Sequence, residues 1–328
     1  MTDSTLSSKY SDIRQVVAHY LGMSLTSTDW STDDQTIIGM IMKRGLSQFY
    51  FPPKIRDDEE PHEWSFLKPT TTLDTVASYS TGTIAVALAG TTVTITTGVW
   101  PSWAATHGTL VVDGTEYAIA SRTDDDEIEL SSAWTETTET VAEYTLQHDG
   151  NYDLPDNHGG IEGKLTFESS NSKPDILIVG EGRIRSLRNS LTSRSNPYYA
   201  AVRPKTTDGA LGQRFEIMFF PIPDDAYTLS YKMMVLASAL TSDIEYPYGG
   251  AIHANTIEAS CLAAAEMQED EKKGAQWGYF MERLTASIQL DKTANSAEYF
   301  GYNSDNSDNR GKGRTIRNQK TVSYDGGS

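Results

Sequence analysis

The feature that most constrains the fold is a change in hydrophobic periodicity, which occurs twice along this chain of 328 residues. Apolar residues recur every three or four positions over 6–49 and again over 257–288, a spacing typical of amphipathic helices. Between about 74 and 147 the chain instead carries short runs in which apolar and polar residues alternate, as in half-buried strands. We therefore expect a β module inserted into a helical host.

The helical segments have recognisable ends. Gly22 follows the first apolar stripe, and the stretch STDD before the second supplies cap residues and acids that favour a helix N-terminus. Pro52 and Pro53 end that second helix, because proline cannot continue a helical hydrogen-bond ladder. Two further stripes, over 257–264 and 277–288, predict a C-terminal helix pair.

The central block predicts a compact all-β unit. Its alternating runs are separated mostly by Gly, Asp or Pro, and they read TIAVAL, TVTITT, TLVV, EYAIAS, EIELS and VAEYTL. Regular short strands with turn signals between them are typical of a small barrel or sandwich.

Beyond residue 150 the pattern mixes both types. GRIRSLRNSL predicts a short helix and YYAAVRP a strand, and WSFL at 64–67 is a further candidate strand. The alternating runs 215–219 and 227–233 flank Pro223-Asp224-Asp225, which predicts a hairpin. The expected fold class is α+β, with a helical bundle core and small hairpin sheet (1–73 and 148–300), the β module (74–147) and a flexible basic C-terminal arm (301–328).

Charge is distributed unevenly. The net charge is −18, and residues 74–149 hold twelve acids and a single base, Arg122. Such a surface repels nucleic acid and anionic membranes. The segment 310–320 is opposite in sign, with five bases and no acid: Arg310, Lys312, Arg314, Arg317 and Lys320. A polar arm of this kind either orders on a partner or has no role, and Tyr299, Phe300 and Tyr302 are candidates to anchor it.

The sequence carries no motif of a known reaction, so we expect no enzyme, no cofactor and no metal. It lacks HExxH, CxxC, a phosphate loop and a GxSxG elbow. The six histidines have no metal-ligand spacing and are interpreted as surface or structural residues. A single cysteine, Cys261, rules out an intramolecular disulfide and fits a reducing compartment. The longest apolar run, IAVALAG, is too short to span a bilayer.

Three polar or aromatic features leave alternatives open. The acidic stretch 124–129 is a solvated turn or a calcium site. Trp100 and Trp103 are core residues of the β module, or they stack on sugars or dock a partner. Four arginines contact phosphates, face solvent or line a subunit interface: Arg183, Arg185, Arg188 and Arg194.

Several stretches resemble the head-to-tail adaptor proteins of tailed bacteriophages, also called connector or head completion proteins. They are WSFLKP (64–69), YDLPDNHGGIEGKLTFE (152–168), YYAAVRP (198–204), GQRFEIMFFPIPDDAYTLSYK (212–232) and YPYGG (246–250). The resemblance covers roughly two-thirds of the chain, and none of these motifs is catalytic. The β module resembles accessory modules of phage virion proteins more loosely, most closely in GTLVVDGTEYAIASR.

The resemblance implies a structural virion protein made in the bacterial host cytoplasm. It implies a homo-oligomeric ring, a dodecamer, at the neck between portal protein and tail or nozzle protein. Genomic DNA would pass through its channel without specific binding, and residues 301–328 would form the portal-binding arm. The alternative is a tail-associated protein that binds glycans or a receptor through the β module.

Overall fold

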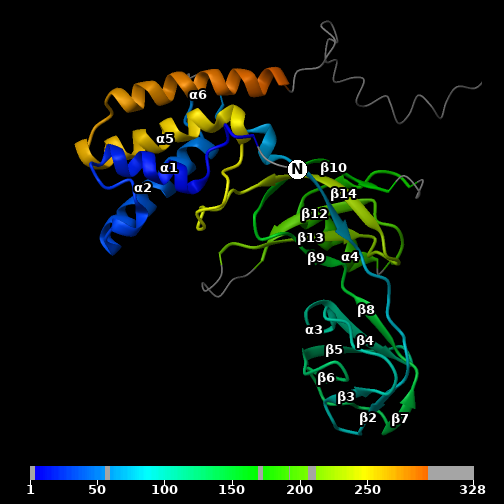
Figure 1. Ribbon diagram of the computed structural model, residues 1–328. Coiled ribbons are helices and arrows are strands. Elements are labelled where there is room, and N and C mark those ends of the chain that lie inside the picture. The colour runs from blue at the N-terminus through cyan, green and yellow to red at the C-terminus, as the bar shows by residue number, and fades with distance from the viewer. Residues whose placement is uncertain (1–3, 56–59, 169–172, 192, 206–211, 295–328) are drawn as a thin grey trace, which may run out of the picture.

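The computed structural model describes residues 4–55, 60–168, 173–191, 193–205 and 212–294. Its described elements form three parts (Figure 1): a cluster of helices, a pair of packed sheets and a curled sheet at the far end. Both residues 301–328 and the anchor candidates Tyr299, Phe300 and Tyr302 lie outside the described residues.

The helical cluster confirms the predicted stripes. It contains α1 (Tyr10–Tyr20), α2 (Thr32–Tyr50), α5 (Gly250–Asp270) and α6 (Ala275–Ala294), with a short 3₁₀ turn η1 (Ser27–Asp29) before α2. Ser31 caps α2 as the STDD stretch predicts: its Oγ accepts from the Asp34 N–H at 3.1 Å, and its own N–H donates to Asp34 Oδ2 at 3.0 Å.

Small residues allow these helices to pack closely. α5 buries Ala259, Ala263, Ala264 and Ala265, which let α1, α2 and α6 approach it. At the crossing of α2 and α5, a Cβ added to Gly45 would lie 2.6 Å from the Cys261 Cα. The crossing therefore requires glycine at this position, and Cys261 is a buried core residue there.

The segment before the first sheet is tied to α6 by a buried carboxylate. Asp291 Oδ2 lies 2.8 Å from His62 Nε2 and accepts the Ser65 N–H at 3.1 Å, while the Ser65 hydroxyl donates to Asp291 Oδ1. Residues 65–67 form the 3₁₀ turn η2 (Ser65–Leu67), so the strand predicted for WSFL is wrong. Trp64 is buried beside it and donates from Nε1 to the Phe49 carbonyl at 2.7 Å.

The middle part is a sandwich of two small sheets. One sheet has the order β1 (Thr70–Asp74), β14 (Thr228–Val235), β10 (His158–Phe167). The other has the order β11 (Leu177–Ile178), β12 (Tyr199–Pro204), β13 (Phe215–Phe220), β9 (Asn151–Asp153). Their facing side chains share one core, which includes Leu73, Leu229 and Tyr231 from the first sheet and Ala200, Ile217 and Phe219 from the second.

The outer face of the four-stranded sheet is covered by α4 (Glu181–Ser190), where the short helix was predicted. Side chains alternate along β13, so Ile217 and Phe219 enter the sandwich core while Met218 and Phe220 pack beneath Ile184 of α4. Both faces of β13 are therefore buried.

The predicted hairpin between 215–219 and 227–233 is wrong. β13 pairs with β12 and β9, and β14 pairs with β1 and β10, so the two strands lie in opposite sheets. The connection crosses between sheets through Pro221 and Pro223, which have no backbone N–H to give to a ladder. Alternation identified both strands correctly, but alternation alone does not specify a partner strand.

The third part, which we call the β-unit, comprises residues 79–148. It is one curled antiparallel sheet, open at its edges, where the sequence predicted a small barrel or sandwich. In spatial order the strands are β7 (Glu139–Ala142), β2 (Ile84–Val86), β3 (Thr92–Ile95), β6 (Glu127–Leu130), β5 (Thr115–Arg122), β4 (Gly108–Val112) and β8 (Thr145–His148). A short helix, α3 (Ala104–His107), precedes β4, and Trp100 and Trp134 fill the separate core.

The expected helical bundle core is wrong for the chain as a whole. The helices of the cluster form one part of three, and the sandwich is built from β1 and the described strands of 151–235, with α4 covering one face. The reason is long-range pairing. β1 precedes the β-unit and pairs with β14, which begins more than a hundred residues after β1. Local periodicity does not report such pairing. Within the described residues, no helix combines the length and apolar character needed to cross a membrane.

Candidate functional site

A network of polar contacts lies where the chain leaves the β-unit and enters the sandwich. β8 ends at His148, β9 begins at Asn151, and Gly150 between them has a φ of 78°. A Cβ at this position would lie 2.9 Å from Arg188 Nη2 and 3.0 Å from the Ile222 side chain. Glycine therefore permits both the left-handed turn and the close approach of neighbouring side chains. We call residues 148–151 the junction.

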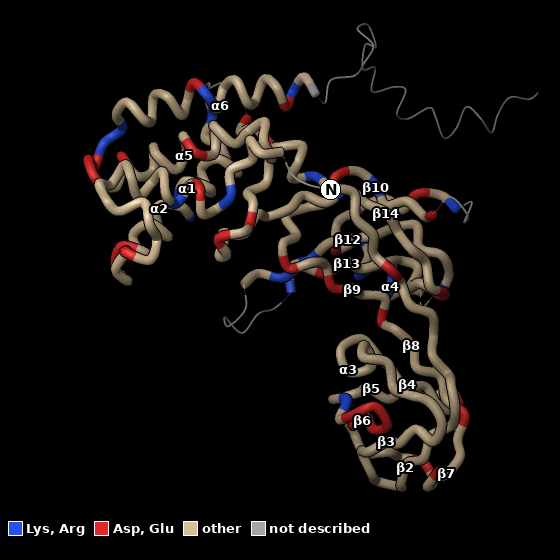
Figure 2. The backbone as a smooth tube through the Cα atoms, viewed as in Figure 1, with Lys and Arg blue, Asp and Glu red and all other residues tan. Residues whose placement is uncertain are grey.

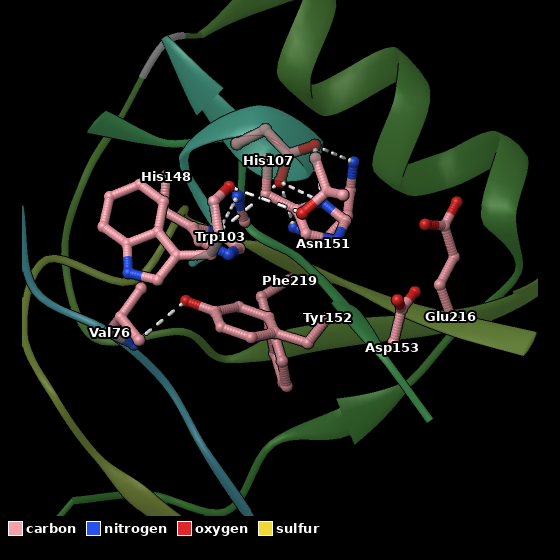
Figure 3. A network of polar contacts seen from close by, with 12 residues as sticks. Val76, Trp103, His107, His148, Asn151, Tyr152, Asp153, Glu216 and Phe219 are labelled. Carbon is pink, nitrogen blue, oxygen red and sulfur yellow. Dashed lines mark hydrogen bonds and ion pairs between the residues drawn. The ribbon is translucent and has the colours of Figure 1, made fainter. Parts of the chain in front are cut away.

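Asp149 is the centre of the junction, and Figure 3 shows two of its partners, His107 and Asn151, close to each other. Its Oδ1 accepts the Asn151 N–H at 2.8 Å, and its Oδ2 accepts the Asn151 side-chain amide at 2.7 Å. Its own N–H donates to the His107 carbonyl at 2.8 Å, which connects the junction to the end of α3. The His107 ring faces the carboxylate, with Nδ1 at 3.3 Å from Oδ1.

His148 is buried in a stack of rings. Its centroid lies 4.3 Å from that of Tyr152, 5.1 Å from that of His107 and 5.2 Å from that of Trp103. Its Nδ1 accepts the Gly150 N–H at 3.0 Å, so in the neutral ring the proton is on Nε2.

Burial and neighbouring groups shift the pKa values of His107, His148 and Asp149 in different directions. Burial lowers the pKa of His148 to about 4, and the nearby His107, Arg194 and Arg188 act in the same direction against Asp149. The hydrogen bond with Asp149 raises the pKa of His107. Burial alone would raise the pKa of Asp149, but hydrogen bonds from His107 and Asn151 hold it below its ordinary value. At neutral pH the junction thus contains an ionised Asp149 and a neutral His148.

Two of the four arginines singled out in the sequence hold this junction from the sandwich side. Arg188 of α4 donates to the Phe219 carbonyl at 2.8 Å, to the Gly150 carbonyl at 2.9 Å and to Asn151 Oδ1 at 2.8 Å. Arg194 donates to the His148 carbonyl at 3.0 Å. These guanidinium groups satisfy backbone oxygens within the chain.

The other two arginines lie on the exposed face of α4. Arg185 pairs with Glu181 one turn earlier at 2.9 Å, and Arg183 lies over the Tyr199 ring at 4.8 Å from its centroid. The sequence therefore grouped four residues that have two different environments, and the subunit-interface hypothesis now concerns Arg183 and Arg185.

The tryptophans and the acidic turn of the β-unit have structural roles. Trp100 is fully buried and donates from Nε1 to the Asp126 carbonyl at 3.1 Å, and Trp103 is half-buried against His148. In the turn between β5 and β6, Asp124 Oδ1 accepts the N–H groups of Asp126 and Glu127, each at 2.8 Å, and Arg122 pairs with Asp125. Figure 2 shows this turn as a red segment beside β6.

Potential metal ligands gather at the junction, away from the acidic turn. Among the described residues, the three-member cluster of His, Cys, Asp or Glu is His107, His148 and Asp149, whose ligand atoms lie within 4.8 Å of one another. The sequence analysis missed it because His107 is forty-one positions from His148 and the two meet only through the pairing of β4 with β8. The nearest sequence signal was the adjacent pair His148-Asp149 followed by glycine.

The junction is suited to holding the rings of His107 and His148 in place. In the described part of the chain, the hydrogen-bond partners of the His107 and His148 rings are Asp149 and the Gly150 amide, and no hydroxyl or thiol is among them. The group of Ser65, His62 and Asp291 also differs from a catalytic triad, since Ser65 and His62 both bond to Asp291. The structure thus defines a protein of three separately cored parts, two of which, the β-unit and the sandwich, meet at a polar junction.

No known protein-family model matches this chain, and no curated protein matches it at a significant level of sequence similarity.

Proposed function

We propose that this chain is a structural protein of a tailed-phage virion, the ring adaptor that joins portal to tail at the neck and lets DNA pass. The observation that carries the proposal is a group of exposed apolar side chains on the segments that lead into α1 and α5 and on the first turn of α5. We call this group the apolar edge, and it consists of Leu6, Ile244, Tyr246, Tyr248 and Ile252.

The apolar edge is well exposed and held in place. The exposed fractions of Leu6, Ile244 and Ile252 are 77%, 75% and 74%. The backbone beneath is fixed, because the Tyr10 N–H donates to the Glu245 carbonyl at 2.9 Å and the Arg14 guanidinium pairs with Asp243 at 2.7 Å. The Tyr248 N–H also donates to the Tyr50 hydroxyl at 3.0 Å.

A preformed apolar surface of this kind favours an assembly role. Exposed apolar groups that lie together are usually covered by a partner. In a ring, each copy meets a neighbour through the same pair of surfaces, so a modest contact is repeated around the closed assembly. We therefore assign the apolar edge to contact between neighbouring copies in the proposed dodecameric ring.

Charge supports the DNA-channel part of the proposal. A net charge of −18 repels the phosphate backbone, so a ring of such subunits would surround DNA without binding it tightly. The five bases of 310–320, outside the described residues, would instead attach the arm to the portal. A virion-neck location after synthesis in the host cytoplasm follows from the same proposal.

The glycan-binding alternative receives less support. It placed the sugar platform at Trp100 and Trp103, but Trp100 has no exposed surface and Trp103 is half-buried against His148. Stacking on a sugar requires an exposed ring face.

The test measures sedimentation of the purified protein with the portal protein of the same virus. We expect Ile252→Asp to abolish co-sedimentation, because it places a charge in the contact between copies. An aspartate near the start of α5 suits the helix, so the fold should persist. Leu88→Asp is the matched control: Leu88 is 59% exposed but lies on the β-unit.

Removal of residues 302–328 tests the arm separately and should also prevent portal binding. Wild-type protein that never sediments with portal, yet binds host-surface polysaccharide, would overturn the adaptor proposal and support the alternative. If wild type and Ile252→Asp bind portal equally well, the apolar edge does not form the contact between copies.

A further inference from the structure

We propose that His107, His148 and Asp149 form a binding site for a divalent transition-metal cation, with zinc as the best match. The site lies at the junction between the β-unit and the sandwich. This inference is independent of the adaptor proposal, because it rests only on the contacts within one chain.

The spacing of the ligand atoms carries the proposal. Asp149 Oδ1 lies 3.3 Å from His107 Nδ1 and 3.5 Å from His148 Nδ1. These separations are long for charge-assisted hydrogen bonds, which are typically about 2.7–2.9 Å. They match the edge of a zinc tetrahedron, since bonds of about 2.0–2.2 Å place neighbouring ligand atoms roughly 3.3–3.5 Å apart. All three ligand atoms lie within 4.8 Å of one another, so metal binding requires the two imidazole rings to move closer to each other.

The surroundings already orient the ligands. Asn151 holds the Asp149 carboxylate through two hydrogen bonds, one from its backbone and one from its side chain. The His148 ring is fixed between Tyr152 and His107, and Trp103 packs beside it. Partners of this kind, outside the metal ligands themselves, fix ring and carboxylate orientation in protein metal sites.

The donor set selects the class of metal. Two imidazoles and a carboxylate suit zinc, cobalt or nickel, whereas magnesium and calcium prefer sites made of oxygen atoms. Three protein ligands leave the fourth tetrahedral position to water. Binding replaces the hydrogen bond from Gly150 N–H to His148 Nδ1, and Arg188 and Arg194 oppose the added charge. Asp149 offsets these costs by neutralising part of the charge of the cation.

A bound cation would stiffen the junction. It would connect the end of α3, through His107, to Asp149, which is hydrogen-bonded to the first residue of β9. The β-unit would then be held to the sandwich by a coordination bond in addition to hydrogen bonds.

The experiment titrates zinc chloride into the full chain, without an affinity tag and after chelator treatment, by calorimetry at pH 8. We expect one zinc per chain and a melting temperature that rises with zinc concentration. Cobalt should give the intense visible absorption of a tetrahedral complex. His107→Gln and Asp149→Asn should each weaken zinc binding at least about 100-fold, and Asn151→Ala about 10–100-fold.

His19→Gln is the matched control, because His19 is exposed on α1, and Figure 1 shows α1 in the helical cluster, away from β8 and β9. Its zinc affinity should equal that of wild type. The proposal fails if wild type binds no zinc, if magnesium binds as tightly as zinc, or if both His107→Gln and Asp149→Asn keep the wild-type affinity. Far-UV circular dichroism of each variant without metal establishes that lost binding is not lost folding.

Discussion

At the scale of single residues, Gly45 sets how closely α2 and α5 approach. Gly45→Ala places a methyl group against the Cys261 backbone, so we expect a loss of about 1–3 kcal/mol in unfolding free energy. Gly39→Ala is the control in the same helix, where an added Cβ meets nothing within 4 Å. That change should be neutral or stabilise by up to about 1 kcal/mol. Urea unfolding followed by the helical circular-dichroism signal measures both, and equal effects would contradict the crossing described.

A second prediction for a single residue concerns Arg188, which holds the junction. Arg188→Ala leaves the Phe219 and Gly150 carbonyls without their guanidinium donors, so we expect a loss of roughly 2–3 kcal/mol. Arg185→Ala, one turn earlier, removes only an exposed pair with Glu181 and should cost about 0–1 kcal/mol. Thermal unfolding measures the stability difference, and hydrogen exchange at Asn151 localises it. A smaller loss for Arg188→Ala than for Arg185→Ala would contradict the inward role.

At the scale of elements, Glu266 of α5 caps the start of α6. Its carboxylate accepts the N–H groups of Gly274, Gln276 and Trp277 at 3.0–3.1 Å. Burial alone would raise the pKa of Glu266, but these backbone hydrogen bonds hold it below its ordinary value. A depressed pKa means that the stabilisation is fully present above the unfolded pKa of about 4.3 and is lost as pH falls through the lower folded value.

The corresponding prediction compares Glu266→Gln with wild type across acidic pH. At neutral pH the variant should be less stable by about 1–2 kcal/mol, because it loses a charged cap at a helix N-terminus. The difference should shrink as pH falls from the unfolded pKa of about 4.3 through the lower folded pKa, because the wild-type carboxyl then becomes protonated. Glu269→Gln is the exposed control on the same helix. A difference that stays constant down to low pH would show that the charge of Glu266 is not what stabilises the helix pair.

The positions of helices and strands were predicted more successfully than the contacts between them. Helical stripes and alternating runs located α1, α2, α4, α5 and α6 and most strands of the β-unit, because each depends on nearby residues. The turn at Ser65 and the short helix at Ala104 were missed, since neither has a full period. The candidate site was missed for a related reason: Asp149 meets His107 only after β4 and β8 have paired.

At the scale of the whole molecule, the β-unit is expected to be separable. Its ends lie side by side, since Tyr79 and Leu146 exchange backbone hydrogen bonds of 2.9 and 2.7 Å. Cutting at residue 74, as the periodicity suggested, would remove Asp74 and Thr75, and both contact the strand β14 or the residue before it. The structure therefore places the cut at residue 79.

Replacing residues 79–148 with a short Gly-Ser linker should leave the helical cluster and sandwich folded, because the β-unit has its own core. The helical circular-dichroism signal and its unfolding midpoint should change little. As a control, the same linker replacing residues 158–167 removes β10 from the sandwich and should unfold it. Collapse of the helical signal in the first variant would mean that the β-unit is needed by the host fold.

The measurement that tests the adaptor proposal most directly is electron microscopy of the purified protein mixed with the portal protein of its own virus. We expect a closed ring of copies, coaxial with the portal, with the apolar edge of each copy against its neighbour and an open channel at the centre. Portal particles with no added ring, or with single copies bound at irregular positions, would contradict it.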